Sequence, residues 1–339
     1  GKEGNFNDWK EYGDWFTTKL LSKKQDLTEA SKQKFISLTK NAASDRDKAK
    51  ILYDYLQKNT RYISIQIGIG GLEPFPASEV DRLGYGDCKA LVNYMGSMLS
   101  AVGIPSYYCM VEAGKRKENF HKTFANVQDG NHAILCLPFK NDTTWLECTS
   151  QNLPFGFLSN FTDDRDVIAC TENGGVIMHT PKYTNSTNLQ VRNADRSLSD
   201  DGSIKGSLNT KFYGTQYENH MEILLASNNE KTKLLAEYYN IDNINFEQVK
   251  YTEHKEHNPF IEENISISIK NYAVKNGNKM LIQPNIFNTQ SSISENKNRT
   301  EGIFIERGFV DIDSINITLP ENIVKKITPE QKVIGKPLG

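Results

Sequence analysis

The chain has 339 residues, of which 37% are hydrophobic and 24% charged, and its formal net charge at neutral pH is -2. This length exceeds what one ordinary core accommodates and predicts two domains. The nearly balanced charge, with Lys and Arg scattered along the chain, gives no electrostatic argument for binding nucleic acid or an anionic membrane, and no stretch approaches the roughly 18 apolar residues of a membrane helix. The chain begins with Gly rather than Met, so we expect a trimmed chain in which the absence of a signal peptide carries no weight.

The N-terminal part predicts helices followed by a strand. Aromatic and aliphatic residues within 1–25 indicate an amphipathic segment that packs on the domain after it, and a helix is expected over 28–40. A third helix begins at Ser44 with a start that resembles a capping box. Its buried stripe consists of Ala49, Leu52, Tyr53 and Leu56. Residues 62–69 alternate as a strand does, and two glycines end it.

A glycine-rich motif precedes the best-marked helix of the chain and reads Gly84-Tyr85-Gly86-Asp87-Cys88. Apolar residues then recur at three- and four-residue steps, which predicts one buried helix face made of Ala90, Leu91, Tyr94, Met95, Met98, Leu99 and Val102. Asp87 occupies the N-cap position, so Cys88 lies in the first turn. Unpaired N–H groups and the helix dipole there favour the thiolate, which is the nucleophilic form. The alternative is that Cys88 is a small core residue.

The rest of this domain predicts strands. We expect them over 105–113, 131–139 and 144–149, with further short strands at 167–170 and 176–179. A long polar loop over 115–130 is of the kind that often borders a site. Helices packed on an antiparallel sheet make an α+β domain.

A polar stretch at 181–188 marks the predicted domain boundary, which leaves 1–182 as the first domain and 189–339 as the second. Strand candidates of the second domain recur at 189–191, 203–213, 218–225, 244–249, 265–272, 279–284 and 302–317. Asn276-Gly277 between two of them is a strong hairpin signal, and one helix is expected over 230–239. The pattern predicts a mainly β, sandwich-like domain.

A cysteine nucleophile needs a base within hydrogen-bond reach and an acid that orients the base. His132 follows Cys88 by 44 residues, and Glu147 follows His132 by 15. If 131–139 and 144–149 form a hairpin with a two-residue loop at 140–141, Glu147 lies opposite Ile134, and His132 and Glu147 share one face. Asp142 in the turn is the alternative acid.

The remaining cysteines and histidines predict no metal site. The five cysteines (Cys88, Cys109, Cys136, Cys148 and Cys170) contain no C-x-x-C pair, and their odd number leaves at least one thiol free. His121 lies in the long polar loop and is a candidate for the rim of a cleft. The other histidines show no ligand spacing, so no metal and no cofactor is expected.

Three motifs together resemble the transglutaminase-like superfamily: Tyr85-Gly86-Asp87-Cys88, Asn131-His132-Ala133-Ile134 and Trp145-Leu146-Glu147-Cys148-Thr149. Residues 61–71, the proline-containing linker after them and Gly86-Asp87-Cys88-Lys89 are more narrowly similar to Bacteroidetes envelope proteins with flanking β domains. The resemblance covers about residues 45–180.

The resemblance implies a papain-like core with a Cys-His-Asp triad in that order. Carried onto this sequence, the nucleophile is Cys88, the general base is His132, and the acid is Glu147, where the family usually has Asp. The backbone N–H of Cys88 and one side chain, from Gln66 or Tyr85, are the candidate oxyanion donors.

We therefore expect a thiol enzyme that attacks an amide carbonyl of a peptide or protein through an acyl-enzyme. Hydrolysis by a peptidase or amidase is favoured by analogy with the family, although the same triad serves a transglutaminase. The resemblance also implies an extracytoplasmic location. The alternative is a catalytically inactive scaffold or envelope binding module that acts through its β domain. The sequence predicts no oligomeric state.

Overall fold

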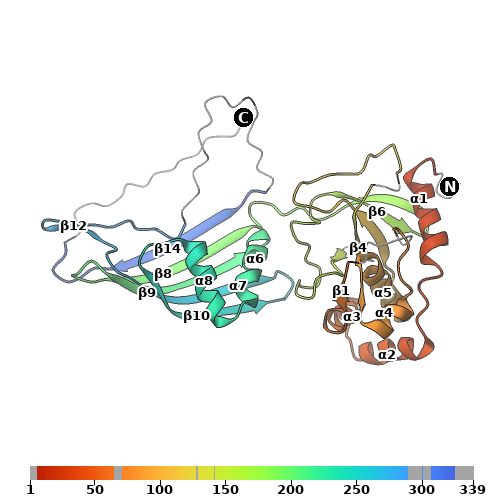
Figure 1. Cartoon of the computed structure of the whole chain (residues 1–339), viewed down its shortest axis with the longest axis horizontal. Helices are drawn as coiled ribbons and strands as arrows, with labels where there is room; N and C mark the ends of the chain where they lie inside the picture. The colour runs from red at the N-terminus through yellow and green to blue at the C-terminus, as the bar shows by residue number, and fades with distance from the viewer. Residues whose placement is uncertain are drawn as a thin grey trace. The chain divides into compact units, whose positions relative to one another are not determined.

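The computed structural model of the chain describes residues 6–64, 71–126, 129–140, 142–288, 300 and 307–324 (Figure 1). The chain forms two compact units. The first consists of Gly1–Thr187 with Lys255–Pro259, and the second of Asn188–His254 with Phe260–Gly339. The chain passes from the first unit to the second inside the polar stretch at 181–188.

The helices expected before the cysteine motif are confirmed. They are α1 (Trp9–Trp15), the π-helix η1 (Phe16–Leu21), α2 (Glu29–Thr39) and α3 (Asp45–Asn59). Ser44 caps α3 as predicted, because its hydroxyl accepts a hydrogen bond from the backbone N–H of Asp47 at 3.1 Å. The aromatic residues of α1 and η1 join the core, so the N-terminal segment packs on its own unit.

The strand expected at 62–69 is represented by β1 (Arg61–Tyr62), which pairs in parallel with β2 (Tyr85–Gly86). Residues 65–70 lie outside the described residues. Between these two strands lies α4 (Ala77–Leu83), which ends at Gly84 in the left-handed conformation.

The cysteine helix, α5 (Cys88–Ala101), begins at the predicted residue, but its burial differs from the prediction. The sequence predicts one apolar face, whereas every residue from Cys88 to Leu99 except Lys89 is buried. The helix lies among other elements, in contact with α2, α3, α4, β3 and β4. The polar Asn93 is accommodated because its amide donates to the carbonyls of Lys24 and Phe75 at 2.9 and 3.0 Å.

A five-stranded antiparallel sheet completes the first unit in the order β5-β4-β3-β6-β7. Its strands are β3 (Tyr107–Val111), β4 (His132–Phe139), β5 (Asp142–Leu146), β6 (Asp166–Thr171) and β7 (Gly174–His179). Helix α5 packs on β4 and β3, and α1 packs on β7 and β6 (Figure 1). Helices on an antiparallel sheet confirm the α+β class of this unit.

The second unit contains a five-stranded sheet in the order β10-β11-β9-β8-β14. Its strands are β8 (Leu189–Leu198), β9 (Ile204–Tyr213), β10 (Ile244–His254), β11 (Phe260–Ile269) and β14 (Val310–Thr318). Only the pairing of β14 with β8 is parallel within this sheet. A separate hairpin joins β12 (Val274–Asn276) to β13 (Lys279–Leu281), as the Asn276-Gly277 signal predicted.

Two expectations for the second unit need correction. The strand predicted at 218–225 is wrong, because this segment belongs to two short helices, α6 (Thr215–Asn219) and α7 (Met221–Leu225). The sandwich is not confirmed. In the described part of this unit the five-stranded sheet packs its apolar side against helix α8 (Asn228–Tyr239) rather than against a second sheet of similar size. Leu235 and Tyr239 of α8 fill a core with Leu208 and Ile265 from the sheet.

Candidate active site

Cys88 lies at the N-terminus of α5, in a position set by the preceding residue. The Asp87 carboxylate accepts a hydrogen bond from the backbone N–H of Ala90 at 2.9 Å, which starts the helix. Its second oxygen pairs with the ammonium of Lys89 at 2.5 Å. Cys88 is therefore presented in the first helical turn, with 8% of its surface exposed.

His132 and Glu147 are brought together by the β4-β5 hairpin. The observed register pairs Phe139 with Asp142 and Leu135 with Leu146, which is the predicted register, whereas Asn141 lies outside the described residues. Continuing this register by one pair sets Glu147, which directly follows β5, opposite Ile134. His132 and Glu147 therefore share a face of the sheet, as the sequence predicted.

The two side chains form a buried ion pair. Nε2 of His132 lies 2.9 Å from Oε2 and 3.2 Å from Oε1 of Glu147. Because a carboxylate only accepts hydrogen bonds, Nε2–H of the imidazole is the donor. Cys88 lies near enough to the same histidine to contribute to raising the pKa of His132. Since Nε2 faces Glu147, Nδ1 is the ring nitrogen left for the thiol.

Glu147 is itself held by two neighbours. The backbone N–H and hydroxyl of Thr149 donate to its Oε1 at 3.1 and 2.6 Å. The hydroxyl of Tyr53, on α3, donates to the backbone carbonyl of Glu147 at 2.9 Å. Together these contacts hold the side chain and the backbone of Glu147, which lies one residue past the end of β5. The alternative acid, Asp142, instead binds the guanidinium of Arg46 at 2.5 Å.

The pKa values of the pair follow from this arrangement. Burial by itself would lower the pKa of His132, but the charge of Glu147, the hydrogen bond that His132 donates to Glu147 and the neighbouring Cys88 outweigh it and raise the pKa to about 10. Burial by itself would raise the pKa of Glu147, but the charge of His132 and the hydrogen bonds from His132 and Thr149 hold it below its ordinary value. At neutral pH the site therefore contains an imidazolium against a carboxylate.

An aromatic side chain that the sequence did not single out lies next to His132. The ring of Phe161 meets the imidazole edge-on, with centroids 5.6 Å apart and an angle of 67° between the planes. Phe161 nevertheless keeps 43% of its surface exposed. It belongs to the segment that connects β5 to β6.

The other candidate residues have different outcomes. Gln66 lies outside the described residues. Tyr85 is half-buried in β2, three residues before Cys88, and its role as an oxyanion donor stays a prediction. His121 is exposed, and its backbone carbonyl accepts a hydrogen bond from the indole of Trp9 at 2.8 Å.

The other four cysteines lie inside the first unit as free, buried thiols. Burial raises the pKa of Cys109 and Cys148 well above the ordinary thiol range and that of Cys170 to about 12. Among the described residues, no group of three or more His, Cys, Asp and Glu side chains has the arrangement of a metal site. No described helix combines the length and apolar character needed to cross a bilayer.

Two residues that support the site were missed by sequence reasoning. Thr149 was part of the quoted motif, and a hydroxyl residue two positions after the acid is a signal that could have indicated its contact with Glu147. Phe161 carries no such local signal, because it lies 29 residues after His132 and meets it only through the fold.

Comparison with known families places the first unit. Residues 32–150 match the family model described as the transglutaminase-like superfamily. This segment, which contains Cys88, His132 and Glu147, is therefore similar to that superfamily, as the resemblance of its motifs predicted.

Among solved structures, a candidate protease from Parabacteroides distasonis ATCC 8503 is similar at 13% sequence identity and a TM-score of 0.42. The match covers 74% of this chain and 51% of that one, so the chain spans about half the length of that protein. The comparison with curated proteins found no match.

Proposed function

We propose that the first unit is a thiol enzyme that cleaves amide bonds of peptides or proteins by a Cys88-His132-Glu147 triad. The observation that carries the proposal is a buried imidazole that binds a carboxylate and lies near enough to the thiol at a helix N-terminus for Cys88 to help raise the pKa of His132. A protonated imidazole beside a thiol stabilises the thiolate, which is the attacking form.

In the proposed reaction, Sγ of Cys88 forms a bond to the amide carbonyl carbon, and the carbonyl oxygen becomes an oxyanion. The backbone N–H of Cys88, at the start of α5, is positioned to donate to that oxygen, with Gln66 or Tyr85 as the second donor. His132 transfers its proton to the amine as the C–N bond breaks. A water molecule, deprotonated by His132, then releases the carboxylic acid product and restores the thiol.

Glu147 has two roles in this proposal. Its carboxylate orients the imidazole, and its charge stabilises the imidazolium. The family usually has Asp at this point, and the longer Glu side chain is fixed here by Thr149. Glu147 therefore takes the role that Asp has in the family.

The triad can pass the acyl group to water, which is hydrolysis, or to an amine, which is transamidation. We favour hydrolysis on the basis of the family resemblance.

We also propose, on the basis of the family resemblance alone, that the protein is extracytoplasmic. Fractionation of source cells into cytoplasm, periplasm and envelope, followed by immunoblotting, tests the location, and recovery in the cytoplasm would overturn it.

The experiment that tests the enzyme is alkylation with iodoacetamide, followed residue by residue by mass spectrometry between about pH 5 and 9. The other cysteines are internal controls, because burial holds the pKa of Cys109, Cys148 and Cys170 high. We expect Cys88 to react fastest at neutral pH, and His132→Ala to slow it about tenfold or more while the exposed-histidine control His121→Ala does not.

Two further observations complete the test. Release of a fluorophore from peptide amides measures hydrolysis, and incorporation of a fluorescent primary amine measures transamidation. If Cys88 reacts no faster than Cys109 or Cys148, or if removal of His132 has no effect, the catalytic proposal is wrong. The alternative of a scaffold that acts through its second unit would then take its place.

A further inference from the structure

An exposed aromatic ring lies next to the proposed catalytic base and leaves apolar area in water. The ring of Phe161 contacts the imidazole of His132, and 43% of the surface of Phe161 is exposed. An exposed apolar surface therefore lies directly beside the imidazole of His132.

The turn that carries Phe161 is held in place by hydrogen bonds and followed by buried residues. Its backbone N–H donates to the hydroxyl of Ser159 at 3.2 Å, and its carbonyl accepts from the N–H of Gly114 at 3.0 Å. Thr162 and Asp163, the next two residues, are fully buried. The exposed ring therefore stands on a fixed base.

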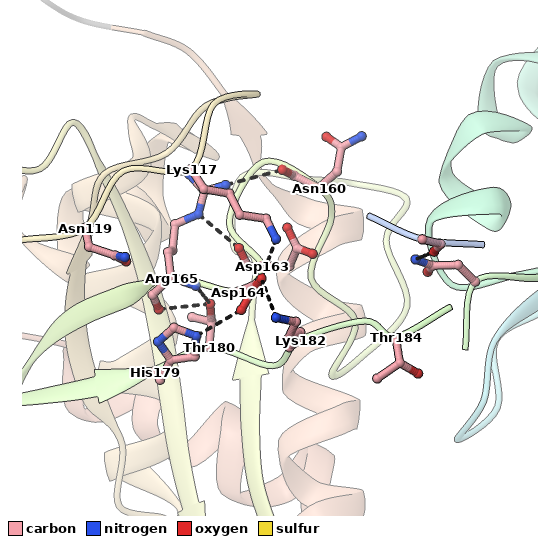
Figure 2. A network of polar contacts seen from close by, with 12 residues as sticks. Lys117, Asn119, Asn160, Asp163, Asp164, Arg165, His179, Thr180, Lys182 and Thr184 are labelled. Atoms are coloured by element: carbon pink, nitrogen blue, oxygen red, sulfur yellow. Dashed lines mark hydrogen bonds and ion pairs between the residues drawn. The ribbon is translucent and has the colours of Figure 1, made fainter. Parts of the chain in front are cut away.

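Arg165 binds the backbone of this turn (Figure 2) and also ties it to the neighbouring loop. Its side chain is fully buried, and its guanidinium donates to the carbonyls of Asp163 at 3.1 Å, Glu112 at 2.6 Å and Gly114 at 3.0 Å. The neighbouring residue, Asp164, adds further contacts, since its carboxylate binds the side chains of Lys117 and His179. A buried arginine that satisfies several carbonyls rigidifies the segments it joins.

Further exposed apolar side chains lie beside the cysteine motif. The backbone N–H of Ile63 donates to the carbonyl of Gly86, two residues before Cys88, at 2.9 Å. The side chains of Tyr62 and Ile63 are 45% and 44% exposed. Apolar surface is thus available next to the nucleophile motif as well as next to the base.

We infer that Phe161 forms the wall of a substrate subsite that takes an apolar or aromatic side chain next to the scissile amide. The inference rests on the proposed function and adds a substrate class to it, namely peptides with an apolar residue at the cleavage point rather than charged ones. A ring fixed in place loses little entropy on binding, and aromatic pairs contribute binding free energy beyond that of their buried area.

Three alkylating probes with one reactive group test the inference: chloroacetamide, N-benzylchloroacetamide and N-carboxymethylchloroacetamide. In each case the thiolate Sγ of Cys88 bonds to the methylene carbon, and chloride leaves as the carbon–chlorine bond breaks. The probes therefore differ only in the group presented to the subsite. The measured quantity is the rate constant for alkylation of Cys88 by each probe, followed by mass spectrometry on the full chain.

We expect the benzyl probe to react with Cys88 about fivefold or more faster than the carboxymethyl probe. Phe161→Ala should reduce this ratio to near one, and Phe161→Leu should retain part of it. The matched control is Phe124→Ala, which removes another exposed phenylalanine of the same unit and should leave the ratio unchanged. A ring that only shields the His132–Glu147 pair would change all three rates together and leave the ratio as it was.

The outcomes separate the two proposals. If Cys88 reacts rapidly with chloroacetamide but shows no benzyl preference, or keeps that preference in Phe161→Ala, the subsite is wrong and the thiol enzyme stands. If Cys88 is no more reactive than the buried cysteines toward any probe, the enzyme proposal fails, and the subsite fails with it.

Discussion

At the scale of single residues, the candidate site depends on charge placed next to an imidazole. The carboxylate of Glu147 reaches His132, whereas Asp142, only five residues earlier, is neutralised by Arg46. The two acids therefore differ in which cation their charge faces. Their separate roles can be tested by removing each charge with an amide of nearly the same size.

Glu147→Gln is expected to slow the alkylation of Cys88 at neutral pH by about tenfold or more, because loss of the carboxylate removes the main contact that raises the pKa of His132. Glu147→Asp keeps the charge and restores the commoner acid of the family, so it should retain more reactivity than the amide. Asp142→Asn is the matched control and should react like the wild type. Equal rates in Glu147→Gln and Asp142→Asn would show that Glu147 has no part in activating the thiol.

The raised pKa of His132 also predicts how stability varies with pH. Its pKa is about 10 in the folded state and about 6.5 in the unfolded chain. Its protonation therefore stabilises the fold fully below about pH 6.5, and this contribution is lost as the pH rises toward 10. Urea unfolding at several pH values should show a steeper loss of unfolding free energy in the wild type than in His132→Gln.

The comparison with His132→Gln isolates one group, because all other titrating residues are shared by the two proteins. If the unfolding free energies of the wild type and the variant changed in parallel between about pH 6.5 and 10, the assigned pKa shift of His132 would be contradicted.

At the scale of elements, the first unit depends on close backbone approach between α1 and β7. A Cβ atom added to Gly175 would lie 2.0 Å from the carbonyl oxygen of Trp9, and one added to Gly13 would lie 2.1 Å from the backbone nitrogen of Gly175. Only glycine at both positions lets the helix lie this near the strand. The N-terminal segment therefore packs closely on the sheet.

Two glycine-to-alanine substitutions are expected to have opposite effects. Gly175→Ala should destabilise the first unit by roughly 1–3 kcal/mol, because a backbone atom blocks the added methyl group. Gly96→Ala, inside α5, should stabilise it by roughly 0.5–1 kcal/mol, since its nearest neighbours would lie 3.6 Å or more away and alanine favours a helix. Unfolding followed by tryptophan fluorescence measures both. A stable Gly175→Ala variant would rule out the close packing.

At the scale of the whole molecule, the two units have separate hydrophobic cores. Leu99 belongs to a core built from the N-terminal helices and the first sheet, and Leu235 to one built from α8 and the second sheet. All three tryptophans of the chain (Trp9, Trp15 and Trp145) and all five cysteines lie in the first unit. Fluorescence and thiol labelling therefore report on the first unit alone, whereas circular dichroism reports on both.

We expect Leu235→Ala to lower the midpoint of the unfolding transition seen by circular dichroism, because it reduces the unfolding free energy of the second unit by roughly 2–5 kcal/mol. The transition seen by tryptophan fluorescence and the labelling rate of Cys88 should stay unchanged. Leu99→Ala, which creates a similar cavity in the other core, should move the tryptophan transition instead. If Leu235→Ala moves both probes together, the units unfold as one cooperative body and the chain does not consist of independent domains.

The sequence by itself determined the features that depend on near neighbours. Ser44 and Asp87 marked helix starts because a cap bonds N–H groups two or three residues away. The loop length expected between the two strands predicted the observed β4-β5 register, because each paired position follows from the loop length. From that register, the shared face of His132 and Glu147 could be predicted before the fold was known.

Only the tertiary structure decided the features that depend on distant parts of the chain. Helix α5 is buried on all sides because several elements surround it, which its own periodicity does not encode. Residues 218–225 are helical although their local pattern favoured a strand. The ring of Phe161 meets His132 because buried Arg165 joins two loops that are about fifty residues apart in the chain. Local hydrogen bonds and side-chain periodicity act over a few residues, whereas burial and long-range contacts depend on how all the elements pack.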